Sequence, residues 1–146
     1  MKIISTNFDG LCLIKHRVYK DARGSFKEIF RKKNLEDFLG YKINFCQENL
    51  VISHRNTLRG LHFQKKPFSQ SKLISLISGE IVDVVVDIRK DSKTYGKTFK
   101  INLSSKDHLS LFVPKGFAHG YSVLSEKAIV VYNVDNYFNQ NHQSGV

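Results

Sequence analysis

Two histidines lie in short sequence contexts that could position a side chain for proton transfer. The first is His62 in "LRGLHFQ", residues 58–64, and the second is His119 in "PKGFAHGY", residues 114–121. Each follows a turn that contains glycine, which lets the backbone bend sharply or approach a ligand closely. Because histidine titrates near neutral pH, either ring could serve as a general acid or base in a cell.

The other four histidines have charged or polar neighbours and lack this glycine context. We expect them to be solvated residues of turns or strand edges: His16, His54, His108 and His142. This leaves His62 and His119 as the candidates for chemistry, with a hydrogen-bonded core histidine as the structural alternative for His119.

Most of the chain has the pattern of antiparallel β-strands. Alternation of β-branched or aromatic residues with polar ones predicts strands at residues 72–78, 80–88, 98–104, 108–113 and 129–135. Turn signals separate them at Ser78-Gly79, Tyr95-Gly96, Ser104-Ser105 and Pro114-Lys115-Gly116. These features favour a mainly β sandwich or jelly-roll barrel, in which alternate residues of each strand can line a ligand cavity.

Only one segment has a convincing helical pattern. In "NLEDFLG", residues 34–40, three apolar side chains share one face at helical spacing. Asn34 can cap the N-terminus of this helix, and Gly40 can adopt the left-handed conformation that ends it. We therefore expect a single short helix in the N-terminal half.

A metal site is the main alternative for the histidines of a jelly-roll barrel, which often holds its metal through paired histidines on one strand. The residue two positions after His62 is Gln64, so the chain has no such pair. Cys12 and Cys46 form no CxxC pair that could replace it. We therefore expect no metal ligated by histidine.

The composition bounds the remaining possibilities. A chain of 146 residues is long enough to form one domain without disulfides, and no linker or repeat divides it. The formal charge is +10, but the lysines are scattered, so we expect attraction of an anionic small molecule and no nucleic-acid partner. No apolar run approaches the roughly 20 residues of a membrane span, and the N-terminus lacks a signal-peptide pattern. A soluble cytoplasmic protein with reduced thiols and no membrane partner is the resulting prediction.

Several longer motifs carry more specific information. They are "DARGSF" (21–26), "QEN" (47–49), "LRGLHFQ" (58–64), "QSKL" (70–73), "GEIVDVVVDIRKDSKTYGK" (79–97), "PKGFAHGY" (114–121) and "VYNVDNYF" (131–138). In this order and spacing they closely resemble the dTDP-4-dehydrorhamnose 3,5-epimerase family, from about Lys2 to Val146. The resemblance implies a metal-free, cofactor-independent cupin, whose jelly-roll barrel is a double-stranded β-helix. It implies an isomerase of surface-polysaccharide precursor synthesis that acts on a nucleotide-linked 4-keto-6-deoxy sugar.

Epimerisation beside a ketone needs three groups. A base removes a proton from C3 or C5 on one face, a second group stabilises the enolate oxygen, and an acid returns a proton on the opposite face. By resemblance, His62 is the base, Lys72 faces the oxyanion and Tyr132 is the acid. Without the motif context, Lys72 would be interpreted as a surface lysine and Tyr132 as a core tyrosine.

The resemblance also assigns contacts with the nucleotide and the sugar. The implied substrate-binding residues are Arg23, Phe26, Glu28, Gln47, Glu48, Asn49, Arg59, His119 and Gln143. An arginine fork pairs well with phosphate oxygens, and Asp83 could orient His119. Relatives are homodimers that exchange N-terminal strands, so residues 23–28 are expected to serve the site of the neighbouring subunit.

The sequence departs from the family pattern at two places. Gln143 replaces a glutamate of the substrate site, and relatives continue past the segment that matches "HQSGV", residues 142–146. The tail of those relatives carries the carboxylate that pairs with the catalytic histidine. Residues 1–146 are therefore expected to form a single cupin-like epimerase domain without this tail. Three explanations stay open for the missing carboxylate: another carboxylate takes its place beside His62, the chain is truncated, or activity is weakened. The alternative function is that of a non-catalytic cupin that binds a sugar nucleotide.

Overall fold

A computed structural model describes all 146 residues, and thirteen strands dominate it. In chain order the elements are β1 (Lys2–Ser5), β2 (Cys12–Lys15), β3 (Val18–Asp21), β4 (Gly24–Lys27), α1 (Lys32–Leu39), β5 (Gln47–His54), β6 (Leu58–Gln64), β7 (Lys72–Ser78), β8 (Glu80–Asp87), β9 (Thr98–Ser104), β10 (Leu109–Val113), β11 (Phe117–Val123), β12 (Lys127–Val134), the 3-10 helix η1 (Gln140–His142) and β13 (Gln143–Gly145). The five strands expected between residues 72 and 135 are present, with ends that differ by at most two residues.

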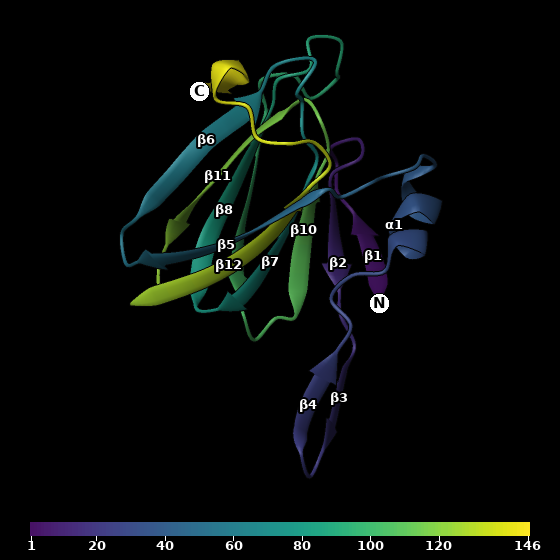
Figure 1. Cartoon of the computed structure of the whole chain (residues 1–146), viewed down its shortest axis with the longest axis vertical. Coiled ribbons are helices and arrows are strands. Elements are labelled where there is room, and N and C mark those ends of the chain that lie inside the picture. Colours follow the sequence, from purple (N-terminus) through teal and green to yellow (C-terminus); the bar gives the residue numbers. More distant parts are fainter.

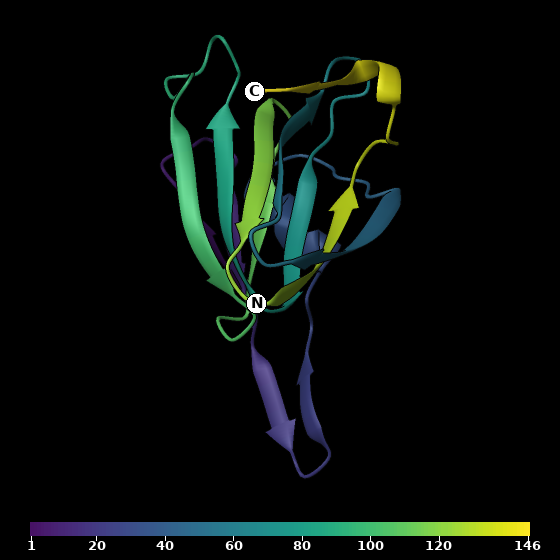
Figure 2. The ribbon, with the colours of Figure 1, turned by 90° about the vertical axis from the view of Figure 1, so that its left-hand side faces the viewer.

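Two antiparallel sheets face each other and form the body of the molecule (Figures 1 and 2). The six-stranded sheet has the order β1-β2-β10-β7-β12-β5, and the five-stranded sheet has the order β13-β6-β11-β8-β9. Successive strands from β5 to β8, and again from β10 to β12, alternate between the two sheets. This wrapping is that of a jelly roll, which confirms the predicted fold class.

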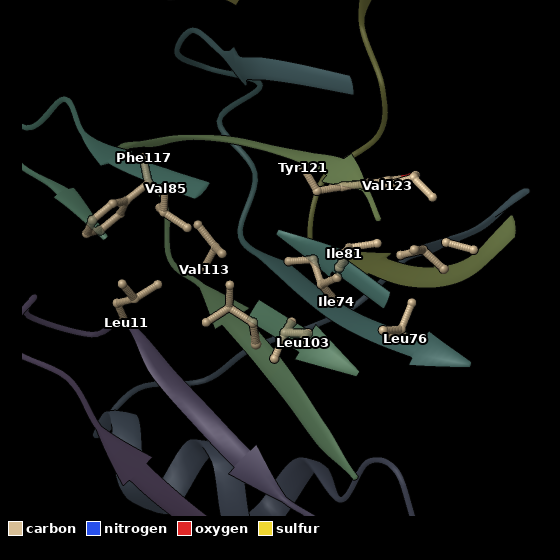
Figure 3. Close-up of a cluster of buried hydrophobic side chains, with 13 residues drawn as sticks. Leu11, Ile74, Leu76, Ile81, Val85, Leu103, Val113, Phe117, Tyr121 and Val123 are labelled. Atoms are coloured by element: carbon tan, nitrogen blue, oxygen red, sulfur yellow. The ribbon is translucent and has the colours of Figure 1, made fainter. Parts of the chain in front are cut away.

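The main core fills the space between the sheets. Figure 3 shows side chains such as Ile74 of the six-stranded sheet and Ile81 of the five-stranded sheet within this cluster of 13 buried residues. In β8 every second residue is buried, so Asp83 lies on the same inward face as Ile81 and Val85. Burial of this apolar surface stabilises the fold, and the strand period fixes which polar residues turn inward.

A second, smaller core lies where α1 covers the other side of the six-stranded sheet. Leu35 of the helix is fully buried there, together with Phe112 of β10. Gly40 ends the helix in the left-handed conformation, as predicted, with φ of 76°. The helix begins at Lys32, after Arg31, which is three residues earlier than a cap at Asn34 predicts, so Asn34 lies inside the helix and the predicted cap is wrong. No helix of the chain combines the length and apolar character needed to cross a membrane.

His16 also corrects the sequence analysis, because it is buried. It follows β2, and its Nε2 lies 2.8 Å from Oγ of Ser110 on β10, which in turn lies 2.8 Å from Oγ of Ser75 on β7. Burial lowers the pKa of His16. Of the four histidines expected to be solvated, His54 is exposed, whereas His108 and His142 are half-buried.

The hairpin formed by β3 and β4 is the one part of the fold that projects away from both sheets (Figures 1 and 2). Its strands pair from Val18 opposite Lys27 to Asp21 opposite Gly24. Tyr19 and Phe26 pack on each other, with ring centroids 6.3 Å apart, but both remain largely exposed. An exposed aromatic pair on a projecting hairpin is suited to contact another surface.

Candidate active site

A cavity of about 390 Å³ lies between the two sheets. Its walls bring together His62, Lys72, His119 and Tyr132, which confirms the prediction that these four side chains share one cavity. An adjoining hollow of about 270 Å³ shares His62, Lys72 and Tyr132 with it. The two spaces therefore meet at the three residues expected to carry the chemistry.

The four side chains come from opposite walls. His62 on β6 and His119 on β11 are register partners in the five-stranded sheet. Lys72 begins β7, and Tyr132 lies on the neighbouring strand β12, both in the six-stranded sheet. A substrate between the sheets would therefore meet the histidines on one face, and the ammonium and phenol on the other.

Two glycines explain the "RGLH" and "AHGY" segments. A Cβ on Gly60 would lie 2.5 Å from Cα of Gly120, and a Cβ on Gly120 would lie 2.5 Å from the carbonyl oxygen of Arg59. Only glycine allows β6 and β11 to approach this closely. The pairing register shifts here, between His119 and Tyr121, and such an irregularity redirects side chains on either side of it.

His119 is held by a buried carboxylate. Its Nε2 lies 3.0 Å from both carboxylate oxygens of Asp83, which is completely buried. The structure thus shows the pairing that the sequence analysis considered for Asp83. A buried carboxylate that hydrogen bonds to one ring nitrogen fixes the orientation of the imidazole.

Lys72 has no hydrogen bond or ion pair with any other side chain. Burial lowers the pKa of its ammonium to about 8, and the nearby negative charge of Asp83 opposes this shift. The side chain is therefore mostly protonated at neutral pH. It supplies an unpaired positive charge to the cavity, where a developing oxyanion would be stabilised.

Tyr132 and His62 complete the set. Burial raises the pKa of the Tyr132 phenol, with the positive charge of Arg59 opposing the shift, so the hydroxyl keeps its proton at neutral pH. His62 is exposed, and no other group of the chain hydrogen bonds to its ring. The phenol can donate a proton, and the free imidazole is open to accept one.

Four of the residues expected to bind substrate also lie here. Arg59 lines the main cavity, while Gln47, Asn49 and Gln143 line the adjoining hollow. Nε2 of Gln47 donates a hydrogen bond of 3.0 Å to Oδ1 of Asn49, which ties the two amides together. These amides and the guanidinium offer donors to oxygen-rich groups.

Glu48 is placed differently from its neighbours in "QEN". Because side chains alternate along β5, it points to the opposite face from Gln47 and Asn49. Its carboxylate accepts a hydrogen bond of 2.7 Å from Nδ2 of Asn133 on that outer face. The structure thus separates Glu48 from the cavity, contrary to its assignment as a substrate contact of the same site.

The N-terminal candidates are also remote from this cavity within one chain. Arg23 lies at the tip of the projecting hairpin and pairs with Asp21 at 2.6 Å, and Phe26 is exposed on β4. Glu28 follows β4 and pairs with Arg31 at 2.8 Å. None of the three contributes to the site of its own chain.

Two residues of the site were not assigned from the sequence. Ser53 lies on the inward face of β5 and accepts a hydrogen bond from Arg59, and Tyr121 lines the cavity. The strand period gave a signal for both, since Ser53 is four residues after Asn49 and Tyr121 is two residues after His119. The structure gathers no group of three or more His, Cys, Asp or Glu side chains that could hold a metal ion.

Comparisons with known proteins converge on one family. The family described as dTDP-4-dehydrorhamnose 3,5-epimerase matches residues 5–146. The chain is 40% identical to the dTDP-4-dehydrorhamnose 3,5-epimerase of Shigella flexneri, over all of this chain and 81% of that protein. It is 42% identical to the Methanothermobacter thermautotrophicus enzyme of the same name, over 99% of this chain and 77% of that protein.

Solved structures agree. The crystal structure of dTDP-4-dehydrorhamnose 3,5-epimerase from Elizabethkingia anophelis is similar with a TM-score of 0.95 and 40% identity, over 100% of this chain and 80% of that one. An epimerase from Legionella pneumophila, solved with dTDP-4-keto-L-rhamnose, is similar with a TM-score of 0.94 and 39% identity, over 99% of this chain and 77% of that one. Both sequence and backbone thus relate the chain to the same enzymes.

Proposed function

The chain belongs to the dTDP-4-dehydrorhamnose 3,5-epimerase family, and from that premise we propose how its residues divide the reaction among them. It is an epimerase that inverts C3, C5 or both centres of a nucleotide-linked 4-keto-6-deoxy sugar through an enolate. The family acts without a cofactor. The alternative of a non-catalytic cupin receives no support from these relationships.

The observation that carries the assignment is the placement of His62 and Tyr132 on opposite walls of one cavity. A ring nitrogen of His62 takes the proton from the carbon beside the ketone, and the electrons of that C–H bond form the enolate. The hydroxyl of Tyr132 then gives a proton to the same carbon from the other face, which inverts it. Each such group contributes about 10²- to 10⁴-fold to a proton-transfer rate.

Lys72 is assigned to the enolate oxygen. Its ammonium lies on the same wall as Tyr132, and no carboxylate neutralises it by direct contact. A fixed charge that meets the oxygen as negative charge develops stabilises the enolate more than the ketone. Both proton transfers pass through this enolate, so Lys72 serves both.

We assign His119 and the polar residues of the hollow to substrate binding. The Asp83 carboxylate keeps His119 in one orientation, so its free ring nitrogen is fixed against the cavity. The Legionella relative holds dTDP-4-keto-L-rhamnose, and a Bacillus anthracis relative that is 46% identical holds TDP and PPi. These ligands support a thymidine diphosphate sugar as the substrate, with Gln47, Asn49 and Gln143 at its polar groups.

We further propose a homodimer in which the hairpin of β3 and β4 reaches the partner's site. On the outer face of β5, Leu50 and Ile52 are 63% and 54% exposed, an apolar surface that a second copy would cover. The hairpin would then present Arg23 and Phe26 to the nucleotide in the neighbouring cavity. Light scattering should give twice the chain mass, and Leu50→Asp should reduce it to one chain.

A cytoplasmic location is the corresponding proposal for the cell. Cys12 and Cys46 are both free thiols, which suits a reducing compartment, and sugar nucleotides are made where nucleotides are available. Fractionation of cells that express the tagged protein tests this location.

Deuterium exchange tests the proposed reaction. In heavy water, the protein should place deuterium at C3, C5 or both positions of dTDP-4-dehydro-6-deoxyglucose, which proton NMR resolves position by position. GDP- and CDP-linked 4-keto sugars, run in parallel, should exchange more slowly. Absence of exchange at both carbons of the thymidine-linked sugar would contradict the function.

A further inference from the structure

Arg59 is held at one end by a buried serine. Its Nε donates a hydrogen bond of 2.8 Å to Oγ of Ser53, and Ser53 is only 3% exposed. The two residues belong to neighbouring strands in the chain, but β5 and β6 lie in opposite sheets. The hydrogen bond therefore links the two walls at the edge of the cavity.

The other end of Arg59 is free. Its two terminal nitrogens have no hydrogen-bond partner in the chain, and no carboxylate lies within ion-pair distance of them. Elsewhere in the protein, arginines such as Arg23 and Arg89 pair with an aspartate. An arginine that lines a cavity with an unpaired fork is suited to take two oxygens of a phosphate.

The Ser53 oxygen has one other polar side chain beside it, that of Tyr121. Burial raises the pKa of the Tyr121 phenol, and the neighbouring Ser53 hydroxyl opposes this shift, but the phenol is not within good hydrogen-bond geometry of any group. Gln47 and Asn49, which share the inward face of β5, bond to each other and not to Ser53. The Ser53 oxygen is thus the atom of the chain that fixes the guanidinium.

We propose that Ser53 is a positioning residue for Arg59, which it holds so that the two free nitrogens of the guanidinium receive the diphosphate of the substrate. This inference rests on the proposed function, which supplies the diphosphate. An arginine is flexible, and ordering it before the ligand arrives removes that cost from binding. Ser53 itself does not touch the substrate.

Binding of dTDP tests this role. Calorimetry should show about tenfold weaker binding of dTDP to Ser53→Ala than to the original protein, equivalent to about 1.4 kcal/mol. KM for the sugar nucleotide should rise by a similar factor, while kcat changes less, because the proton-transfer groups are untouched. In a protein that carries Arg59→Ala, adding Ser53→Ala should have no further effect on dTDP affinity, because Ser53 acts through Arg59.

Three variants serve as controls. Ser53→Thr keeps the hydroxyl and should keep the affinity for dTDP. Ser53→Cys keeps the volume but offers a weak acceptor, so it should lose affinity as Ser53→Ala does, even where the alanine variant folds poorly. Ser75→Ala removes another buried serine with a 2.8 Å hydrogen bond, on β7 away from the cavity, and should bind dTDP normally.

The outcomes separate this inference from the proposed function. If the original protein binds dTDP and exchanges deuterium but Ser53→Ala and Ser53→Cys bind dTDP as tightly, the positioning role is wrong. An equal loss in the Arg59→Ala background, or an equal loss in Ser75→Ala, would also overturn it. An original protein that neither binds dTDP nor exchanges deuterium would instead contradict the proposed function.

Discussion

The two walls of the cavity differ in how they hold their reactive groups. On the five-stranded wall, His119 is tied to the buried Asp83, whereas its register partner His62 is exposed and unpaired. On the six-stranded wall, Lys72 and Tyr132 are both shifted in pKa chiefly by burial. One wall thus combines a fixed ring with a free one, and the other keeps a cation and a phenol protonated at neutral pH.

This difference suits a reaction with opposite demands on its two faces. A base must be open to accept a proton and release it to solvent, which fits the exposure of His62. An acid and an oxyanion partner must hold their protons until the enolate forms, which fits the half-buried Tyr132 and Lys72. Five predictions test whether the walls divide the work in this way.

Replacement of His62 should have the largest effect. His62→Ala removes the base, and no other unpaired group on the five-stranded wall can replace it. We expect exchange and inversion to fall together by at least about 10². NMR in heavy water measures both, and near-normal exchange in the variant would mean that His62 is not the base.

Lys72→Met should lower activity while it stabilises the fold. It keeps the length of the side chain but removes the charge, so exchange and inversion should both slow by about 10². The apolar side chain avoids the burial of an ammonium, so Tm at pH 7 should rise. Thermal unfolding and the exchange assay check the two results, and a lower Tm with unchanged exchange would contradict the assignment.

Asp83→Asn should distinguish the role of His119 from that of His62. It weakens the hold on His119, so the free energy of unfolding should fall by about 1–3 kcal/mol. Exchange should fall less than in His62→Ala, since the base itself is untouched. Urea unfolding gives the stability, and a loss of exchange as large as that of His62→Ala would show that the fixed ring is the base.

The smallest effect that we expect is the change of kcat/KM with pH as the Lys72 ammonium loses its proton. Its pKa of about 8 in the folded protein lies below its ordinary value, so the ammonium is lost as pH rises through about 8. We expect kcat/KM to fall above this pH by at most about tenfold per unit. Between pH 8 and the ordinary lysine pKa, the unfolded chain binds the proton that the folded one lacks, so this group makes stability rise with pH. If kcat/KM of Lys72→Met does not fall above pH 8, the fall in the original protein is due to Lys72.

The strands could be predicted from the sequence because alternation and turn residues are local features of the chain. The strand from Lys72 to Ser78 and the one from Glu80 onward follow from period-two alternation and the Ser78-Gly79 turn. His16 shows the limit of such reasoning. Its polar neighbours indicated exposure, but it is buried because Ser110, far along the chain, lies beside it.

Within the site, the motifs indicated which segments form the cavity, but they did not indicate which side chains of a segment point into it. "QEN" matched as a block, yet the alternation of β5 sends Glu48 to the other face from Gln47 and Asn49. The same alternation would have pointed to Ser53, which was missed because it lies outside every quoted motif. The pairing of Ser53 with Arg59 depends on two sheets meeting, and no local pattern encodes that.

The central claim is that the acid acts from the wall opposite the base, and Tyr132→Phe tests it most directly. The variant keeps the ring and its packing but removes the hydroxyl, so His62 can still take a proton and return one to the same face. In heavy water we predict that exchange with retention of configuration outruns inversion, whereas inversion accompanies exchange in the original protein. If Tyr132→Phe inverts the sugar as often per exchange event as the original protein does, Tyr132 is not the acid and the division between the walls is wrong.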